Sequence, residues 1–316
     1  MISYSDFLLS VFGPGKVQKL TLNLGLGCPN RDGTIGRGGC IYCNNSSFSP
    51  TLADAGADIE TQIAAARGFF ARKCPSMRYL AYFQTYTSTY TDPERLAAIY
   101  RRALACPDVC GLVVATRPDT MPQGLLDMLA EISRTLAPVI IEYGAESSHD
   151  VTLARINRCH LWADTVDAVT RTHKAGLPVG LHLIFGLPGE TEEMMLSTVA
   201  RVSALPIDTI KFHQLQVIQG TPLAAEFLRN GGLDNPAEAC RRLEITNWTA
   251  ESYTDFCIRV LDQLRPDIAV DRFVSQAPPD MLLHPRWGLK NHVFTDRLMA
   301  KINKAHNTSA SKTWHS

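Results

Sequence analysis

The chain alternates short apolar runs with longer segments whose apolar residues recur every three or four positions. Six runs are dense in aliphatic and aromatic residues, as expected of strands buried on both faces: 19–26, 79–84, 111–116, 139–143, 179–185 and 209–214. Five amphipathic segments of helical length lie between them: 59–73, 93–105, 123–136, 162–175 and 191–204. This α/β alternation predicts a parallel sheet with helical crossovers, a partial (β/α)6 TIM-like barrel.

The pattern divides the chain into four parts. Residues 1–16 form an N-terminal lead-in, and 17–220 form the barrel. From 221 to 302 the pattern predicts a helical and irregular extension that caps the barrel, with helices at 223–230 and 236–259, a short strand at 268–273 and an irregular proline-rich stretch at 272–287. The polar segment 303–316 is predicted to be a disordered tail.

Composition restricts the class of protein. Lys plus Arg and Asp plus Glu number 31 each among 316 residues, so net charge gives no argument for nucleic-acid binding. The N-terminus lacks the basic region of a signal peptide, and no apolar run approaches membrane-spanning length. We expect a soluble cytoplasmic protein whose nine cysteines are mostly reduced.

Three of these cysteines, Cys28, Cys40 and Cys43, form a C-x11-C-x2-C array in a glycine-rich loop after the first predicted strand. This spacing suits a metal or iron–sulfur centre, and three thiolates on a 4Fe-4S cluster leave one iron free for another ligand. A structural zinc site would want a fourth Cys or His nearby, which the loop lacks. A disulfide does not suit the expected compartment.

The segment from Cys28 to Cys43 resembles the YhcC-like branch of the radical S-adenosylmethionine (radical SAM) enzymes, which is related to the radical domain of the Elongator acetyltransferase. The resemblance implies a 4Fe-4S cluster on Cys28, Cys40 and Cys43, with S-adenosylmethionine chelated by the fourth iron. Reductive cleavage would yield a 5′-deoxyadenosyl radical. It also implies a reductant such as flavodoxin or ferredoxin.

Reactive residues of such barrels lie at the carboxyl ends of the strands. By resemblance, the cofactor-binding candidates are Gln84, Tyr86, Thr87, Glu142, Ser147, Arg158, His182, Gly186, Leu187 and Pro188. For Arg117, an ion pair with the glutamate at the neighbouring strand end, Glu142, and contact with a ligand are equally open. Two positions depart from the family pattern, because Glu146 stands in place of Gln and Cys159 in place of Gly. On the sixth strand, Lys211 and His213 are candidate catalytic or substrate contacts.

These features predict a radical SAM enzyme that acts on an unidentified substrate. Kinship to Elongator implies a tRNA wobble uridine side chain, by analogy at the level of the fold. A small-molecule reaction such as methylthiolation, rearrangement or oxidative decarboxylation is the alternative within enzymes. An iron–sulfur electron carrier or redox sensor that does not cleave S-adenosylmethionine, and a zinc-stabilised binding module, are the alternatives of other classes.

Overall fold

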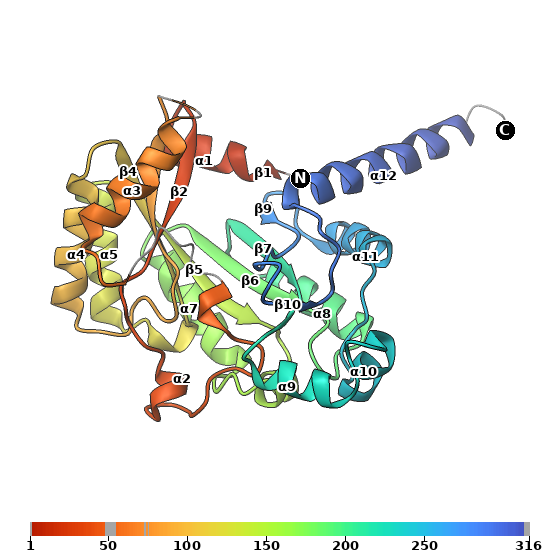
Figure 1. The fold of residues 1–316 in the computed structure, drawn as a ribbon. Helices are drawn as coiled ribbons and strands as arrows, with labels where there is room; N and C mark the ends of the chain where they lie inside the picture. The colour runs from red at the N-terminus through yellow and green to blue at the C-terminus, as the bar shows by residue number, and fades with distance from the viewer. Residues whose placement is uncertain (1, 48–54, 73, 75, 313–316) are drawn as a thin grey trace.

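The computed structural model describes residues 2–47, 55–72, 74 and 76–312. Its centre is a curved, parallel, eight-stranded sheet with the order β1-β9-β7-β6-β5-β4-β3-β2 (Figure 1). The strands are β1 (Ile2–Ser3), β2 (Val17–Leu22), β3 (Arg78–Phe83), β4 (Val109–Thr116), β5 (Val139–Glu146), β6 (Val179–Phe185), β7 (Thr209–Gln214) and β9 (Ala269–Arg272). The partial-barrel prediction is confirmed, and all six predicted strands are present.

The predicted crossover helices are present as well. They are α3 (Ile59–Ala71), α4 (Pro93–Ala105), α5 (Gln123–Thr135), α7 (Trp162–Lys174) and α8 (Glu192–Ser203). Side-chain caps fix several starts: Asp92 accepts from the backbone N–H groups of Glu94 and Arg95 before α4, and Thr191 accepts from that of Met194 before α8. The predicted end of α3 at residue 73 lies outside the described residues.

The N-terminal lead-in contains two elements that the hydrophobic pattern did not predict. Strand β1 pairs with β9, which itself pairs with β7, so both strands extend the predicted sheet at one edge. Helix α1 (Tyr4–Phe12) packs Phe7 and Phe12 against the sheet residues Leu80, Val113 and Ile140. This apolar cluster fills the end of the barrel where the strands begin.

The C-terminal extension differs in detail from the predicted pattern. The helix expected at 236–259 is two helices, α10 (Pro236–Leu243) and α11 (Ala250–Gln263), because Glu244 adopts a left-handed conformation with φ 54°. Helix α9 (Pro222–Arg229) precedes them. The proline-rich stretch contains β10 (Leu282–His284), which pairs with β8 (Val217–Ile218) in a small antiparallel sheet.

The last helix, α12 (Asn291–Lys312), extends away from the body of the molecule (Figure 1). It begins in the predicted extension and continues into the segment for which the sequence predicts disorder. The remaining helical elements are short: α2 (Pro29–Asp32), α6 (Asp150–Arg155) and the 3-10 turns Asn45–Ser47 and Pro118–Thr120. None of the helices in the described ranges has the length and apolar character needed to cross a membrane.

Strand side chains alternate between the helix-covered face and the interior of the barrel. On the outer face they form one large apolar core with the crossover helices. On the inner face, residues near the strand beginnings are apolar, as in Leu80 and Ile140, whereas later ones are polar, as in Glu142, His182 and Lys211. The barrel is therefore sealed at one end and polar toward the carboxyl ends of its strands.

Candidate active site

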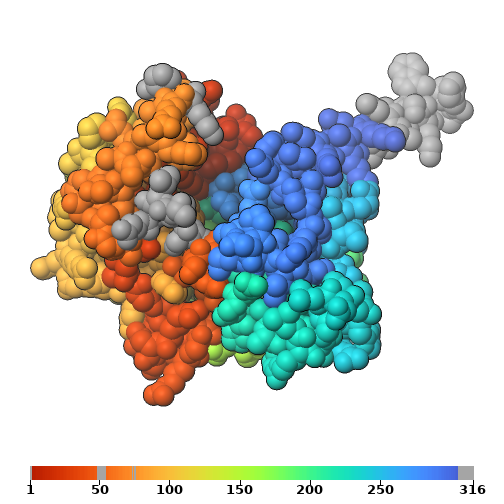
Figure 2. Space-filling model, viewed as in Figure 1, coloured from red at the N-terminus to blue at the C-terminus, as the bar shows by residue number. Residues whose placement is uncertain are grey.

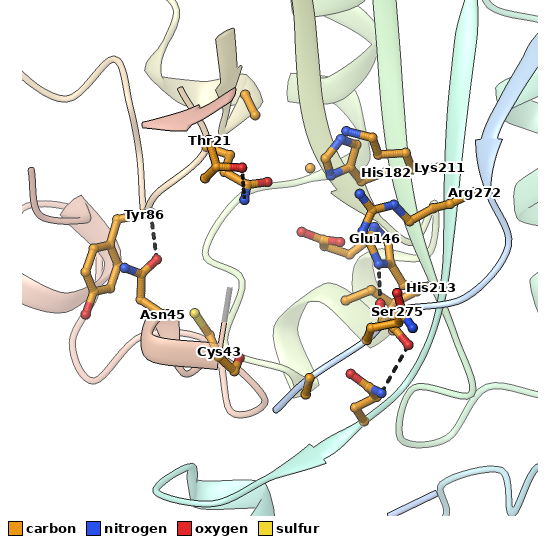
Figure 3. Close-up of a pocket in the computed structure, with 18 of the residues that line it drawn as sticks. Thr21, Cys43, Asn45, Tyr86, Glu146, His182, Lys211, His213, Arg272 and Ser275 are labelled. Atoms are coloured by element: carbon orange, nitrogen blue, oxygen red, sulfur yellow. Dashed lines mark hydrogen bonds between the residues drawn. The ribbon is translucent and has the colours of Figure 1, made fainter. Parts of the chain in front are cut away.

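The polar interior opens into a cavity of about 950 Å³. Its walls come from both ends of the chain, and the space-filling view shows the N-terminal and C-terminal segments meeting on this face (Figure 2). Most of the predicted site residues line it: Cys28, Cys40, Cys43, Gln84, Tyr86, Thr87, Arg158, His182, Lys211 and His213. In Figure 3, Cys43 and Tyr86 lie on one side of the cavity, and Lys211 and His213 lie on the other.

The cysteine loop is held in shape by its own backbone. The N–H of Cys43 donates to the carbonyl oxygen of Cys40 at 3.0 Å, and Arg31 Nη2 donates to the carbonyl oxygen of Cys43 at 2.8 Å. Gly39 has φ +80°, and a Cβ there would lie 2.8 Å from Arg31 Nε. Burial, reinforced by Cys40, raises the pKa of the Cys43 thiol to about 11.

All three thiols are free and line one cavity. Across the described ranges, no three His, Cys, Asp or Glu side chains are grouped as ligands of a single metal ion. A four-iron cubane holds each thiolate on a different iron, so its ligands need not meet at one point. The donor set, three thiols and no fourth protein ligand, fits a cluster with one open iron.

The Cys40 thiol is in contact with two polar side chains. Asn30 Nδ2 lies 3.6 Å and Arg158 Nη1 3.8 Å from its sulfur. Asn157 anchors the loop from the other side, because its Nδ2 donates to the carbonyl oxygen of Gly39 at 2.8 Å. These contacts fix the cysteine loop to the segment between α6 and α7, and they place the Arg158 cation beside the Cys40 thiol.

The loop after β3 faces the cysteine loop. The backbone N–H of Tyr86 donates to Asn45 Oδ1 at 2.9 Å, and Gln84 Nε2 donates to Thr21 Oγ1 at 3.4 Å (Figure 3). Thr87 is fully buried, and its hydroxyl has no hydrogen-bond partner among the described residues. An unsatisfied buried hydroxyl costs roughly 1–3 kcal/mol. Beside the thiols, it fits a polar ligand such as the methionine group of S-adenosylmethionine.

Arg117 forms an ion pair, but its partner is Asp119 rather than the glutamate expected at the neighbouring strand end. Its Nε and Nη2 donate to the Asp119 carboxylate at 2.9 and 2.7 Å, and Nη2 also donates to the carbonyl oxygen of Arg158 at 2.9 Å. Its Nη1 is buried and has no partner among the residues that the structure describes. Since Arg117 lines the cavity, the two N–H bonds of Nη1 are left over beside it.

The two departures from the family pattern have a structural account. Cys159 has φ +59°, in the left-handed region that favours glycine, so the backbone conformation expected for Gly is retained with a larger residue. Its sulfur would lie 2.7 Å from a Cβ at Gly36 in the cysteine loop. Glu146 lines the cavity and pairs with Arg158 at 3.4 Å, so the additional negative charge has a counter-ion.

Five of the cofactor-binding candidates do not line the cavity: Glu142, Ser147, Gly186, Leu187 and Pro188. Ser147 donates its hydroxyl to Glu190 at 2.5 Å. Gly186 has φ +91°, and a Cβ there would lie 2.7 Å from Trp248 Nε1. The close approach expected at this glycine is thus made by an indole from the C-terminal extension, which sequence reasoning did not indicate.

Glu142 is the centre of a buried network of charges. Its carboxylate lies 2.9 Å from Lys19 Nζ, 2.5 Å from Lys211 Nζ and 3.0 Å from His182 Nε2, and Asp271 lies 2.8 Å from Lys19 Nζ. Sequence analysis missed Lys19 and Asp271. Their available signal was a charged residue inside an apolar strand, since such charges are seldom buried unless they are paired.

This network shifts the titration of its members. Burial alone would raise the pKa of Glu142, but Lys19 and Lys211 hold it well below its usual range. Burial lowers the pKa of Lys211 to about 8 although Glu142 opposes the shift. Burial, with contributions from His182 and Arg272, lowers the pKa of His213 well below its usual range. His213 is therefore neutral at pH 7. The pKa of Lys211, about 8, lies close to neutral pH.

Comparison with known proteins gives concordant results. The family model described as the Radical SAM superfamily matches residues 22–202, and the Radical_SAM C-terminal domain matches 237–304. Protein YhcC of Escherichia coli (strain K12) is 38% identical over 272 residues, 86% of this chain and 82% of that protein. Protein YtqA of Bacillus subtilis (strain 168) is 32% identical over 292 residues, 92% and 84% of the two chains.

Among solved structures, the archaeal Methanocaldococcus infernus Elp3 with an N-terminal deletion has the same fold. Its TM-score is 0.68 at 17% identity, and the match covers 92% of this chain and 64% of that one.

Proposed function

The chain belongs to the radical SAM superfamily, and from this premise we propose that it cleaves S-adenosylmethionine at a cluster held by Cys28, Cys40 and Cys43, to act on an organic substrate in the cavity. Members of the superfamily are enzymes that use a 4Fe-4S cluster, S-adenosylmethionine and an external reductant. The observation that carries the proposal is the position of three free thiols on one cavity beside a loop with an unsatisfied buried hydroxyl.

When bound, the cluster, reduced by one electron from an external donor, and S-adenosylmethionine would supply a 5′-deoxyadenosyl radical, with methionine as the other product. The chain's own residues bind and orient. Arg158 and Asn30 contact the Cys40 sulfur and fix one cluster ligand. Thr87 and the spare N–H bonds of Arg117 offer hydrogen bonds to the polar groups of S-adenosylmethionine.

The wall from β7 and β9 binds the substrate in this proposal. Lys211 and His213 line the side of the cavity that lies opposite the cysteine loop (Figure 3). Because Lys211 has a pKa of about 8, it is able to give or take a proton near neutral pH. The apolar cluster around α1 closes the opposite end of the barrel and excludes water there.

A tRNA wobble uridine is a second candidate substrate, favoured by one feature of the cavity rim. Tyr86 is 39% exposed, and the Arg31 guanidinium lies 5.5 Å from its ring centroid. An exposed aromatic ring beside an arginine is a platform on which an unstacked base can stack. The Elp3 fold agrees with this candidate by analogy. A small metabolite is the simpler occupant of a cavity of about 950 Å³.

The test is anaerobic cluster reconstitution, followed by dithionite, S-adenosylmethionine and chromatography for 5′-deoxyadenosine. Iron and sulfide are quantified in the same samples. Cys43→Ala removes one proposed ligand, and Cys106→Ala is the matched control, because Cys106 is a free thiol at the end of α4, outside the cavity lining. We expect 5′-deoxyadenosine from the wild type and the control only.

A well-loaded cluster that yields no 5′-deoxyadenosine, with or without added substrate, would favour an electron carrier or redox sensor. One zinc per colourless chain would favour a binding module. Stimulation by tRNA lacking wobble modifications, but not by a small-metabolite extract, would select the tRNA candidate; the reverse result would select a small molecule.

A further inference from the structure

Arg272 is a cation in the cavity wall that lacks a counter-ion. It is the last residue of β9 and lines the cavity, on the side away from Cys43 in Figure 3. Its side chain is partly buried. Within the ranges that the structure describes, its guanidinium makes neither a hydrogen bond nor an ion pair. A guanidinium withdrawn from bulk water is costly unless an anion or other acceptors meet it.

The neighbouring charges do not supply that anion. Lys19 and Lys211 pair with Glu142 and Asp271 at distances between 2.5 and 3.4 Å, so two positive charges meet two negative ones. Arg272 is additional to this balanced set. Its charge acts on the same groups, since it contributes to lowering the pKa of both Lys211 and Asp271.

The other arginines of the lining each have a partner, two of them a carboxylate and Arg31 a backbone carbonyl. Glu146 pairs with Arg158 at 3.4 Å, and Arg117 pairs with Asp119 at 2.7 Å. Arg31 donates to the carbonyl oxygen of Cys43 at the other side of the cavity. Among the described residues, Arg272 is therefore the cation of the lining that has neither a carboxylate nor a carbonyl partner.

The residues around Arg272 form a fixed polar surface. His213 Nδ1 and the Ser275 hydroxyl are hydrogen-bonded, and the Ser275 N–H donates to Gln214 Oε1 at 2.7 Å (Figure 3). Gln216 Nε2 donates to the Ser275 carbonyl oxygen at 3.3 Å. His213 adds no competing charge because it is neutral at pH 7. A surface built in advance loses little entropy when a ligand binds.

We propose that Arg272 binds an oxyanion of the substrate, a carboxylate or a phosphate, and so fixes the rest of the substrate between the β9 wall and the cysteine loop. This inference rests on the proposed function and names the substrate class. The planar guanidinium matches either oxyanion through two parallel N–H···O bonds, which a lysine cannot form.

The experiment uses full-length, cluster-loaded protein saturated with S-adenosylmethionine and kept without reductant, so that the cofactor stays intact. Inorganic phosphate, acetate and neutral acetamide are titrated separately by calorimetry at constant ionic strength. The variants are Arg272→Gln, Arg272→Lys and the control Arg229→Gln, which changes an exposed arginine of α9 that is paired with Glu226 at 3.7 Å. Circular dichroism and iron content report folding.

The wild type and the control are expected to bind phosphate or acetate but not acetamide. Arg272→Gln should weaken that binding at least tenfold. The anion affinity of Arg272→Lys should lie between those of the wild type and Arg272→Gln. The preferred anion identifies the source of the oxyanion. If Arg272→Gln does not fold, the comparison of Arg272→Lys with the wild type, with a threefold or greater loss, carries the test.

Equal anion affinity in the wild type and both Arg272 variants would overturn the proposal. It would also be overturned if Arg272→Gln weakens binding of S-adenosylmethionine instead, because the guanidinium would then bind the cofactor's carboxylate. Failure of the proposed function is a separate result: the wild type would give no 5′-deoxyadenosine while anion binding still depended on Arg272.

Discussion

Replacing Glu142 by Gln tests whether the barrel interior depends on its buried charges. The carboxylate is 1% exposed and contacts Lys19 and Lys211 at 2.9 and 2.5 Å, and it also accepts from the Tyr82 hydroxyl at 2.9 Å. The amide retains the shape of the side chain but removes the charge. Asp271 is then the sole carboxylate among the described residues within ion-pair distance of either lysine.

Removing one partner of a buried ion pair costs about 3–5 kcal/mol, because the remaining charge is left without compensation. Unfolding entropy near the melting temperature is about 2.1 cal/mol/K per residue, or roughly 0.7 kcal/mol/K for 316 residues. The expected decrease in melting temperature is therefore about 4–7 °C. The loss should appear in the free energy of unfolding with little change in far-ultraviolet circular dichroism.

The assay is thermal and urea unfolding of Glu142→Gln beside Glu131→Gln. The control makes the same chemical change in an exposed pair, where Glu131 lies 2.5 Å from Arg134 with side chains 53% and 71% exposed. Exposed pairs contribute roughly 0–1 kcal/mol. A loss in Glu142→Gln no larger than in the control would refute the argument that this network stabilises the fold.

Two further predictions concern Glu190 and Arg158. Burial raises the pKa of Glu190 to about 7, so its contribution to stability is full below its unfolded pKa near 4.5 and is lost as pH rises through 7. Urea titrations should therefore show the free energy of unfolding of Glu190→Gln, relative to wild type, rising by roughly 3 kcal/mol as the pH increases from 4.5 to 8. A difference that does not change with pH would contradict this. Arg158 lies 3.8 Å from the Cys40 sulfur, and its positive charge favours the reduced cluster. Arg158→Gln should lower the cluster's midpoint potential, on the order of tens of millivolts, in titrations followed by electron paramagnetic resonance, with Arg134→Gln as control; an unchanged or higher potential would exclude this role.

Hydrophobic periodicity was sufficient to predict the central sheet and its crossover helices. Each predicted strand and crossover helix is long enough to show a repeat, and the ends of β6 and β7 coincide with their predicted limits. Strand β1 has two residues, which is too short for any periodicity, and its pairing with β9 joins the two ends of the chain. Local pattern carries no information about such a pairing.

The cavity residues likewise fall into those that the local sequence reveals and those that only the fold brings together. The thiols lie in a 16-residue segment, Cys28 to Cys43, so spacing alone brought them to attention. Lys19 and Asp271 are 252 residues apart and meet because β2 and β9 face each other across the barrel interior. The sequence motif identified Gly186 as a site of close approach to the backbone. The group that approaches is Trp248, which lies 62 positions further along the chain. Motifs therefore located the thiol side of the cavity, and only the fold located the rest.

This division bears on how the enzyme obtains its specificity. The cysteine loop and the β3 loop come from the first third of the chain, and the proposed function gives them the chemistry that the superfamily shares. The opposite wall is assembled from β7, β9 and the segment around Ser275, which belong to the last third of the chain. If Arg272 binds the substrate as proposed, a change of substrate requires changes in Arg272 and its neighbours without disturbance of the thiols. The unpaired guanidinium is consequently the place where the substrate of this chain is best sought.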